Sequence, residues 1–126
     1  MNIDKIQNQL SRYNIMQNTF FEACPIPLRD LLGQTRRHSV TRWRTVGMVW
    51  MRLSGMSLKQ AGAMFNRHHT SVVHSEIEIL NALDGFHPKL KDTFDKVLDY
   101  ANNSCVKSED LYINYVNSQI TLQNNA

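Results

Sequence analysis

Cysteine is scarce in this sequence, and no apolar run is long enough to cross a bilayer. Cys24 and Cys105 are the two cysteines, and their wide separation argues against a disulfide framework and against a cysteine-based metal site. Arg52 interrupts the longest apolar stretch, which begins near Val46, so we expect no membrane span. The opening "MNIDKIQNQL" lacks the basic start and the apolar core of a secretion signal. These absences predict a cytoplasmic protein with no membrane partner.

Carboxylates are missing from about a third of the chain. Between Leu31 and Ser75 there are seven Lys and Arg residues and no Asp or Glu. The other seven cations and all eleven carboxylates lie outside this basic segment, which is therefore +7 while the remainder is −4. A surface that only needs solubility mixes both signs of charge. The basic segment instead predicts a surface that binds a polyanion.

Catalytic and cofactor motifs are also missing. No serine or cysteine lies near a base in a recognisable nucleophile arrangement, and the phosphate-binding pattern GxxxxGK[ST] does not occur. His68, His69 and His74 are the clustered candidates for metal ligands. Adjacent residues and residues five apart do not share a helix face, so these side chains diverge. We therefore expect no enzymatic activity, no cofactor and no metal.

Apolar residues recur at helical spacing in most segments, and no segment alternates as a strand does. The sequence therefore predicts an all-α fold. The stretch "QTRRHSVTRWR" (34–44) has no periodicity and is expected to be a polar, basic link. The expected helices are a first one marked by residues 3 to 13, then 19–24, 28–32, one from about 46 to 53, one beginning after 57, a longer one between 66 and the "DGFHP" break, one from 88 to about 101, and one over 108–118.

The helical spacing also predicts which residues form the core. Trp50 fits an apolar helix face, whereas Trp43 lies between two arginines and is open to stacking on a single-stranded nucleic acid. His74 is expected to be partly buried. The other expected core positions are Val46, Val49, Leu53, Leu58, Ala61, Phe65, Val73, Ile77, Leu80, Leu90, Phe94, Val97, Leu98 and Ala101, with Met48, Met51, Met56 and Met64 as filler.

Two expected helices meet at a tight corner within "MSLKQAGAMFNRHHTSVVHS" (56–75). Ser57 is placed to cap the first helix, with Gln60 completing a capping box, and Asn66 suits a left-handed turn. The second helix begins in hydrogen-bond donors, next to free backbone N–H groups that favour a phosphate. Arg, His, Thr and Ser can also contact base edges. The corner therefore indicates a helix-turn-helix, whose polar cluster is Arg67, His68, His69, Thr70 and Ser71.

The segment "SLKQAGAMFNRHHTSVVHS" resembles the signature of the C-terminal DNA-binding domain of the bacterial chromosomal replication initiator, DnaA, usually close to "SLPEIGxxFGGRDHTTVxHA". "FFEACPIPLRDLLGQTRRHSVTRWRTVGMVWMRLSG" resembles the opening helix, apolar link, basic loop and third helix of that domain, and "HPKLKDTFDKVL" resembles its closing helix. The resemblance covers about residues 18 to 100. It implies a Trp-repressor-like helix-turn-helix bundle over 18–102, with an extra N-terminal helix over 1–17 and a partly disordered C-terminal extension over 103–126.

The resemblance also implies double-stranded DNA as the partner and a way of binding it. In the family, the N-terminal end of the recognition helix enters the major groove, and an arginine of the basic loop enters the adjacent minor groove. Phosphate contacts fix the register without reading sequence. Carried over by position, Arg67, His68, His69, Thr70 and Ser71 face base edges or the major groove, Arg42 enters the minor groove, and Arg36, Arg37, Arg44 and Lys59 contact phosphates.

This sequence departs from the family pattern at the places that contact DNA. Asn66 stands where the family has Gly-Gly, and His68 stands where it has an aspartate. Trp43 replaces a proline of the basic loop, and Glu76 and Glu78 stand where the family tends to be basic. An aspartate only accepts hydrogen bonds, whereas a neutral histidine donates one and accepts one. We therefore expect a base preference different from the family's usual site, and contact that ends within the first two turns of the recognition helix.

The resemblance does not extend to the family's ATPase module, since the phosphate-binding pattern is missing. The expected function is therefore sequence-specific DNA binding with an accessory or regulatory role in replication initiation or transcription. The alternative is a protein-interaction module on the same fold that has lost useful DNA affinity. In that case the acidic second half, the N-terminal helix or the C-terminal tail "SEDLYINYVNSQ" would bind a protein partner.

Overall fold

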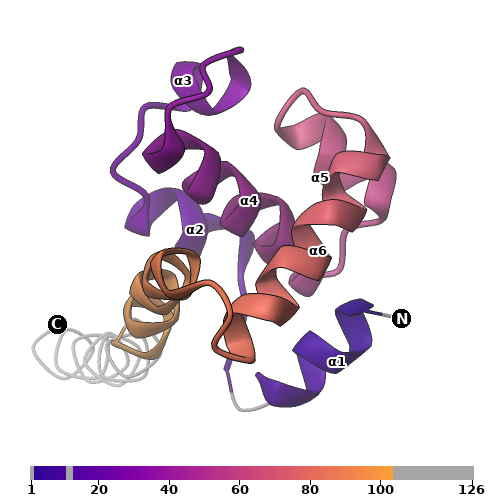
Figure 1. The fold of residues 1–126 in the computed structure, drawn as a ribbon, viewed down its shortest axis with the longest axis vertical. Coiled ribbons are helices and arrows are strands. Elements are labelled where there is room, and N and C mark those ends of the chain that lie inside the picture. Colours follow the sequence, from indigo (N-terminus) through magenta and orange to yellow (C-terminus); the bar gives the residue numbers. More distant parts are fainter. Residues whose placement is uncertain (1, 11–12, 104–126) are drawn as a thin grey trace, which may run out of the picture.

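The computed structural model describes residues 2–10 and 13–103. Within these ranges every regular element is a helix and no strand is present, which confirms the all-α prediction. The expected helix over 108–118, Cys105 and the C-terminal extension lie outside the described residues. The helices are α1 (Asn2–Gln9), α2 (Gln17–Ala23), α3 (Leu28–Leu32), α4 (His38–Leu53), α5 (Leu58–Met64), α6 (His69–Leu83) and a last helix over 88–103, drawn in orange in Figure 1.

Helix α4 is the centre of the molecule. It contacts α1, α2, α3, α5 and α6, and every residue from Trp43 to Met51 is buried. A helix that is enclosed on all sides must be apolar nearly all round, and the run from Val46 to Met51 meets this requirement. Figure 1 shows α2 and α3 on one side of α4 and the α5–α6 pair on the other. The helix-turn-helix is therefore mounted on a buried helix that fixes its position.

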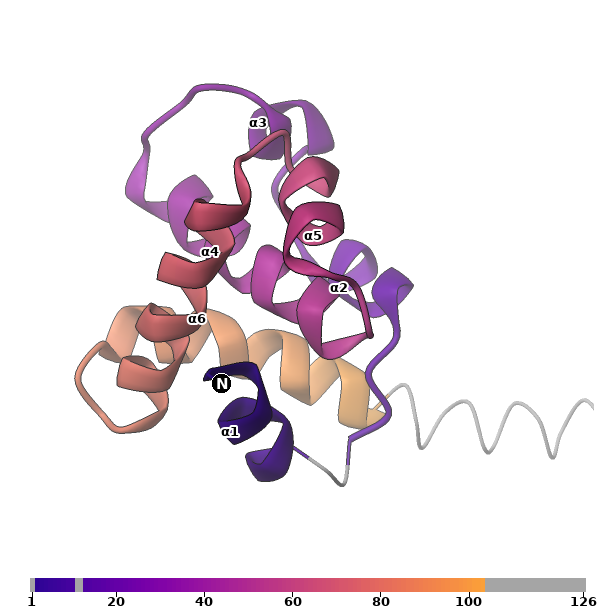
Figure 2. The same cartoon turned by 90° about the vertical axis from the view of Figure 1, so that its right-hand side faces the viewer.

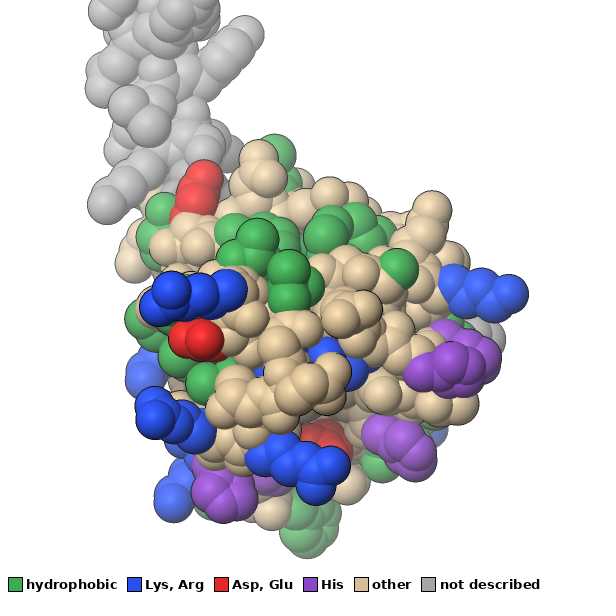
Figure 3. All heavy atoms as spheres, turned by 90° about the horizontal axis from the view of Figure 1, so that it is seen from above, with side chains coloured by type: hydrophobic (Ala, Val, Ile, Leu, Met, Phe, Trp, Pro, Cys, Tyr) green, Lys and Arg blue, Asp and Glu red, His purple; other side chains and the backbone are tan. Residues whose placement is uncertain are grey.

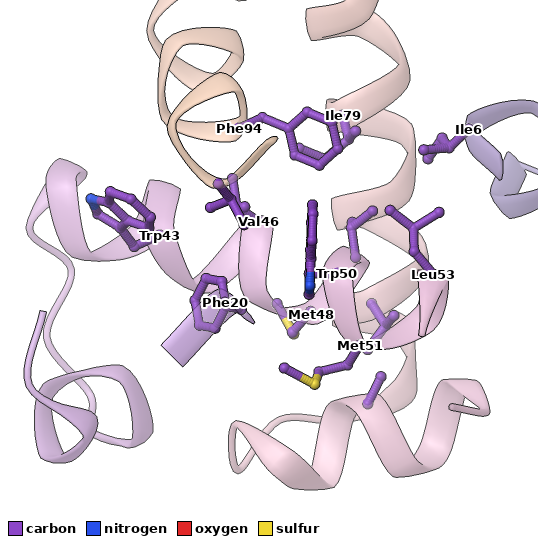
Figure 4. Packing of buried hydrophobic residues seen from close by; sticks show 14 of the residues in the cluster. Ile6, Phe20, Trp43, Val46, Met48, Trp50, Met51, Leu53, Ile79 and Phe94 are labelled. Carbon is purple, nitrogen blue, oxygen red and sulfur yellow. The ribbon is translucent and has the colours of Figure 1, made fainter. Parts of the chain in front are cut away.

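Aromatic rings fill the space around α4 (Figure 4). Trp50 lies edge-on to Phe94 of the 88–103 helix, with ring centroids 6.1 Å apart, and its indole N–H donates to the Met16 carbonyl at 2.9 Å. Phe20 of α2 lies edge-on to Phe65, with centroids 5.7 Å apart. These contacts confirm that Trp50 and the apolar face of the 88–103 helix belong to one core.

The start of α4 differs from the sequence prediction. Residues 38–44 were expected to be a polar link, but α4 begins at His38. Val40, Trp43 and Val46 form an apolar row at i, i+3 and i+6, which the surrounding Arg, Thr and Ser residues conceal in the sequence. Trp43 is only 7% exposed and lies against Phe20, with centroids 6.3 Å apart. Trp43 is therefore a core residue and does not offer a stacking surface for a single strand.

The buried face of α6 also differs from the prediction, because the buried positions lie one residue earlier in the sequence than expected. Ile77 is 42% exposed and His74 is exposed, although both were expected to be at least partly buried. The prediction followed the apolar residues alone, and two of the residues on the inward face are polar. Each of these is satisfied, since the Ser75 hydroxyl donates to the Ser71 carbonyl at 2.9 Å and the Glu76 carboxylate forms an ion pair. The buried positions of α6 are Val72, Ser75, Glu76, Ile79 and Ala82.

Helix α1 is part of the same bundle. Its apolar side buries Ile3 and Ile6, and Leu10 just beyond it is also buried. Helix α1 contacts α4 and α6, and it lies beside the end of α6 that is farther from the turn (Figure 2). The apolar face of α1 is therefore buried in the core, and the exposed residues of α1 are polar.

Candidate nucleic-acid interface

The turn between α5 and α6 is compact because its backbone elements approach closely. Ser57 caps α5, and Gln60 completes the predicted capping box. Asn66 adopts the predicted left-handed conformation, with φ of 56°. The Arg67 N–H donates to the Gly62 carbonyl at 2.8 Å, and a Cβ on Gly62 would lie 2.7 Å from the Arg67 carbonyl oxygen. Glycine at position 62 is what allows α5 to lie against the turn, and this geometry sets where α6 begins.

The first turn of α6 brings together four of the five residues predicted at the corner. His68 is the N-cap of α6, and its Nδ1 accepts the Thr70 N–H at 3.3 Å. The His68 and His69 rings lie with their centroids 4.1 Å apart. His68 and Thr70 are exposed, while His69 and Ser71 are partly exposed. The N-terminal end of α6 is therefore a polar tip that solvent, or a ligand, can reach.

Arg67, the fifth residue of the predicted cluster, turns back toward the protein. Its Nη1 donates to the carbonyls of Phe65 and Asn66, at 3.3 and 3.1 Å. Its Nη2 donates to the carbonyl of Gly33, in the loop between α3 and α4. Arg67 thus connects the helix-turn-helix to the basic loop 33–37. In this arrangement its guanidinium donates to backbone oxygens and is not directed outward.

Arg44 has the same kind of partner and is more deeply buried. It is only 7% exposed. Its Nε donates to the Leu31 carbonyl at 2.7 Å, and its Nη2 lies 3.1 Å from the Asp30 carbonyl and 3.4 Å from those of Gly33 and Thr35. Burial, and to a lesser extent the nearby charge of Arg67, lower the pKa of Arg44. The phosphate contact expected for Arg44 does not agree with this geometry, which favours a role in holding the loop.

A pocket of about 450 Å³ lies between the basic loop, the start of α4 and the turn. None of its lining residues is acidic, and three of them are arginines, so its electrostatic potential is positive. Because Arg44 and Arg67 donate to the same Gly33 carbonyl, the pocket wall is continuous from the loop to the turn. The lining residues are Gln34, Thr35, Arg36, His38, Thr41, Arg44 and Arg67.

The remaining predicted cations are closer to solvent. Arg36, Arg37 and Lys59 are exposed, and Arg42, in the second turn of α4, is partly exposed. Figure 3 looks down on the end of the molecule that carries α3 and the tips of α5 and α6, and Lys, Arg and His side chains border most of this face with few carboxylates among them. This end of the molecule therefore presents mainly cationic and histidine side chains along its border.

One contact that the sequence prediction missed changes the charge of α6. Glu76 stands where the family tends to be basic, and it was one reason to expect that DNA contact ends within the first two turns of α6. Glu76 is buried, with its carboxylate 2.8 Å from Nε of Arg52 on α4, and the two side chains are 5% and 13% exposed. Arg52 also donates to the Met56 carbonyl at 2.9 Å. The signal for this ion pair in the sequence is Arg52, the single arginine in the apolar run of residues 46–53, which needs a buried counter-charge. Arg44, Arg52 and Arg67 all donate to partners within the protein, so four of the seven cations of the basic segment remain directed to solvent: Arg36, Arg37, Arg42 and Lys59.

Other kinds of site have little support in the part of the chain that the structure describes. Residues 2–10 and 13–103 contain no group of His, Cys, Asp and Glu side chains that could hold a metal ion. Burial raises the pKa of the Cys24 thiol, which makes it a poor nucleophile. Among the same residues, no helix combines the length and the apolar character that a membrane crossing requires.

Comparison with known proteins identifies the same region. The family model described as the bacterial DnaA protein helix-turn-helix matches residues 14–79. This match runs from just before α2 into α6, so it includes the basic loop, the turn and the polar tip, and it covers more than half of the chain. No solved structure shows a significant match.

Proposed function

The chain belongs to the bacterial DnaA helix-turn-helix family, a family of DNA-binding domains, and on this premise we propose that it binds double-stranded DNA sequence-specifically, in an accessory or regulatory role in replication initiation or transcription. The observation that carries the proposal is an exposed polar helix tip together with four cations of the basic segment that are directed to solvent. This is the charge pattern that neutralises a phosphate backbone while one helix reads the groove.

Each element has a distinct task in the proposed complex. The tip of α6 enters the major groove, and its His and hydroxyl side chains contact base edges. Arg42 enters the neighbouring minor groove, and Arg36, Arg37 and Lys59 bind phosphates, which fix the register. Arg67 holds the turn against the basic loop and adds positive charge next to the groove. The residues of the tip are His68, His69, Thr70 and Ser71.

Affinity for DNA is expected to fall steeply with salt. Three phosphate-binding cations alone predict a slope of log affinity against log salt of about −2.7, and all four solvent-directed cations predict about −3.6. Fluorescence anisotropy with a duplex obtained by in-vitro selection measures this slope between low and physiological salt. Lys96→Ala is the matched control, because Lys96 is an exposed cation on the 88–103 helix, paired with Asp92, and its loss should leave the slope unchanged. A flat response to salt would contradict the proposal and favour the protein-interaction module.

Arg42→Ala is expected to weaken binding mainly at sites flanked by A·T pairs. A narrow A·T minor groove has enhanced negative potential and attracts an inserted arginine, so we expect a loss of roughly tenfold there and a smaller loss at G·C-flanked sites. Arg37→Ala is the control, since a phosphate contact should weaken both duplexes equally. Competition binding with the two duplexes measures the ratio of the affinity for the A·T-flanked site to the affinity for the G·C-flanked site. Equal losses for Arg42→Ala on both would show that Arg42 lies outside the minor groove.

A further inference from the structure

His68 has two roles at the polar tip, and the first restricts the second. As the N-cap of α6, its Nδ1 accepts the Thr70 N–H at 3.3 Å. A backbone N–H can only donate, so Nδ1 carries no proton in this arrangement. A neutral imidazole has one protonated and one unprotonated nitrogen, and the proton of His68 is therefore on Nε2.

The contacts around the ring hold this tautomer in place. The Thr70 hydroxyl lies 2.9 Å from the same Nδ1, and because Nδ1 is unprotonated the hydroxyl is the donor. The His69 ring lies against the His68 ring, with centroids 4.1 Å apart and the ring planes tilted by 38°. The acceptor of His68 is thus occupied within the protein, and the side chain is exposed. What remains for a ligand is the single donor at Nε2.

From this geometry we propose that His68 reads DNA as a donor only, selecting a base with a hydrogen-bond acceptor on its major-groove edge and rejecting cytosine. The inference rests on the proposed function, in which the tip of α6 enters the major groove. Guanine presents N7 and O6, adenine presents N7 and thymine presents O4 as acceptors, whereas cytosine presents only the N4 amino donor. A carboxylate at position 68 has the opposite preference, because it accepts from cytosine and cannot donate.

Three substitutions at position 68 separate capping from base reading. Asparagine and aspartate both cap helices well, so His68→Asn and His68→Asp preserve the start of α6, which thermal unfolding checks. His68→Asn retains a donor through its amide NH₂, while His68→Asp retains none. His68→Ala removes both the cap and the donor. His68→Asn and His68→Asp therefore differ in whether position 68 can donate a hydrogen bond, while both keep the helix cap.

In-vitro selection of duplexes bound by each variant is the test. We expect the wild type to disfavour cytosine at one position of the selected site by roughly tenfold. His68→Asn keeps this preference, His68→Asp converts the same position to a preference for cytosine, and His68→Ala loses the discrimination. The inference would be overturned if His68→Asp selected the same base as the wild type at that position, or if the Asn and Asp variants had identical base preferences.

The chain provides a matched control on the opposite end of α6. His87 caps the 88–103 helix in the same way, with its Nδ1 accepting the Leu90 N–H at 3.3 Å. The 15 residues of α6 separate it from the tip by about 22 Å, so His87→Asp should change no position of the selected site. Salt-dependent binding with no effect of His68→Asp would remove this inference alone, whereas the absence of any selected duplex would remove the proposed function and this inference together.

Discussion

Glu76→Ala is expected to lower the free energy of unfolding by about 3 kcal/mol, because it leaves the Arg52 guanidinium buried without its counter-charge. The two side chains are 2.8 Å apart and nearly enclosed, and they join α4 to α6. Water cannot replace the lost carboxylate without opening the contact between these helices. Chemical denaturation of the full chain, followed by circular dichroism, measures the change.

Two further variants show whether the charge or the shape of the Glu76 side chain accounts for the loss of stability. Glu78→Ala removes a carboxylate from an exposed position of the same helix, and its effect should stay within about 0.5 kcal/mol. Glu76→Gln keeps an acceptor for Arg52 Nε and should lose less stability than Glu76→Ala, since the hydrogen bond survives. Equal effects of Glu76→Ala and Glu78→Ala would mean that Arg52 finds another partner and that the ion pair does not hold α6 in place.

Gly62→Ala is expected to reduce DNA affinity by roughly tenfold to a hundredfold, since displacing the tip of α6 removes base contacts worth about 1–3 kcal/mol each. The added methyl would lie 2.7 Å from the Arg67 carbonyl oxygen and 3.3 Å from that of His68. Both are backbone atoms, which cannot rotate away as a side chain does. The start of α6 must therefore shift, and overpacking should also cost about 1–3 kcal/mol of stability. Titration of the selected duplex, at a temperature where the variant is fully folded, measures the affinity.

Ala63→Ser is the matched control for Gly62→Ala. Ala63 is the next residue of α5 and is exposed, so one added heavy atom meets no backbone there. We expect wild-type affinity and nearly wild-type stability from this variant. Wild-type DNA binding by a folded Gly62→Ala protein would show that the close approach of α5 to the turn does not set the position of the tip.

The helix-turn-helix was predictable from sequence because its determinants are local. Ser57 with Gln60, and Asn66 at the corner, each produce their conformation through neighbouring backbone groups. The apolar face of the 88–103 helix was equally clear, since Leu90, Phe94 and Val97 recur at helical spacing and are all buried. The one buried polar residue of this helix, Thr93, donates to the Lys89 carbonyl one turn earlier, so it needs no distant partner. Local chemistry and the apolar pattern agree in these segments, so their helices, caps and buried faces could be predicted from the sequence alone.

The mistaken predictions concern polar residues whose partners are far away in sequence. Arg44 bonds to carbonyls 9 to 14 residues earlier, and Arg52 pairs with a carboxylate 24 residues later. Charge alone suggests that each faces solvent, and only the packed fold supplies the oxygens that make burial favourable. The burial of Arg44 and of Glu76 could not be predicted from the sequence for this reason, and the phase of the buried face of α6 was mispredicted with it.

The Gly33 carbonyl accepts hydrogen bonds from both Arg44 and Arg67, and so one oxygen atom couples the loop of residues 33–37 to the corner that starts α6. Neither part can move without breaking a bond to the other. In a complex with a duplex, the two parts would form a single rigid template, and the protein would respond to the distance between adjoining grooves as well as to the bases within them. Local DNA shape would then influence recognition even at positions that no side chain touches.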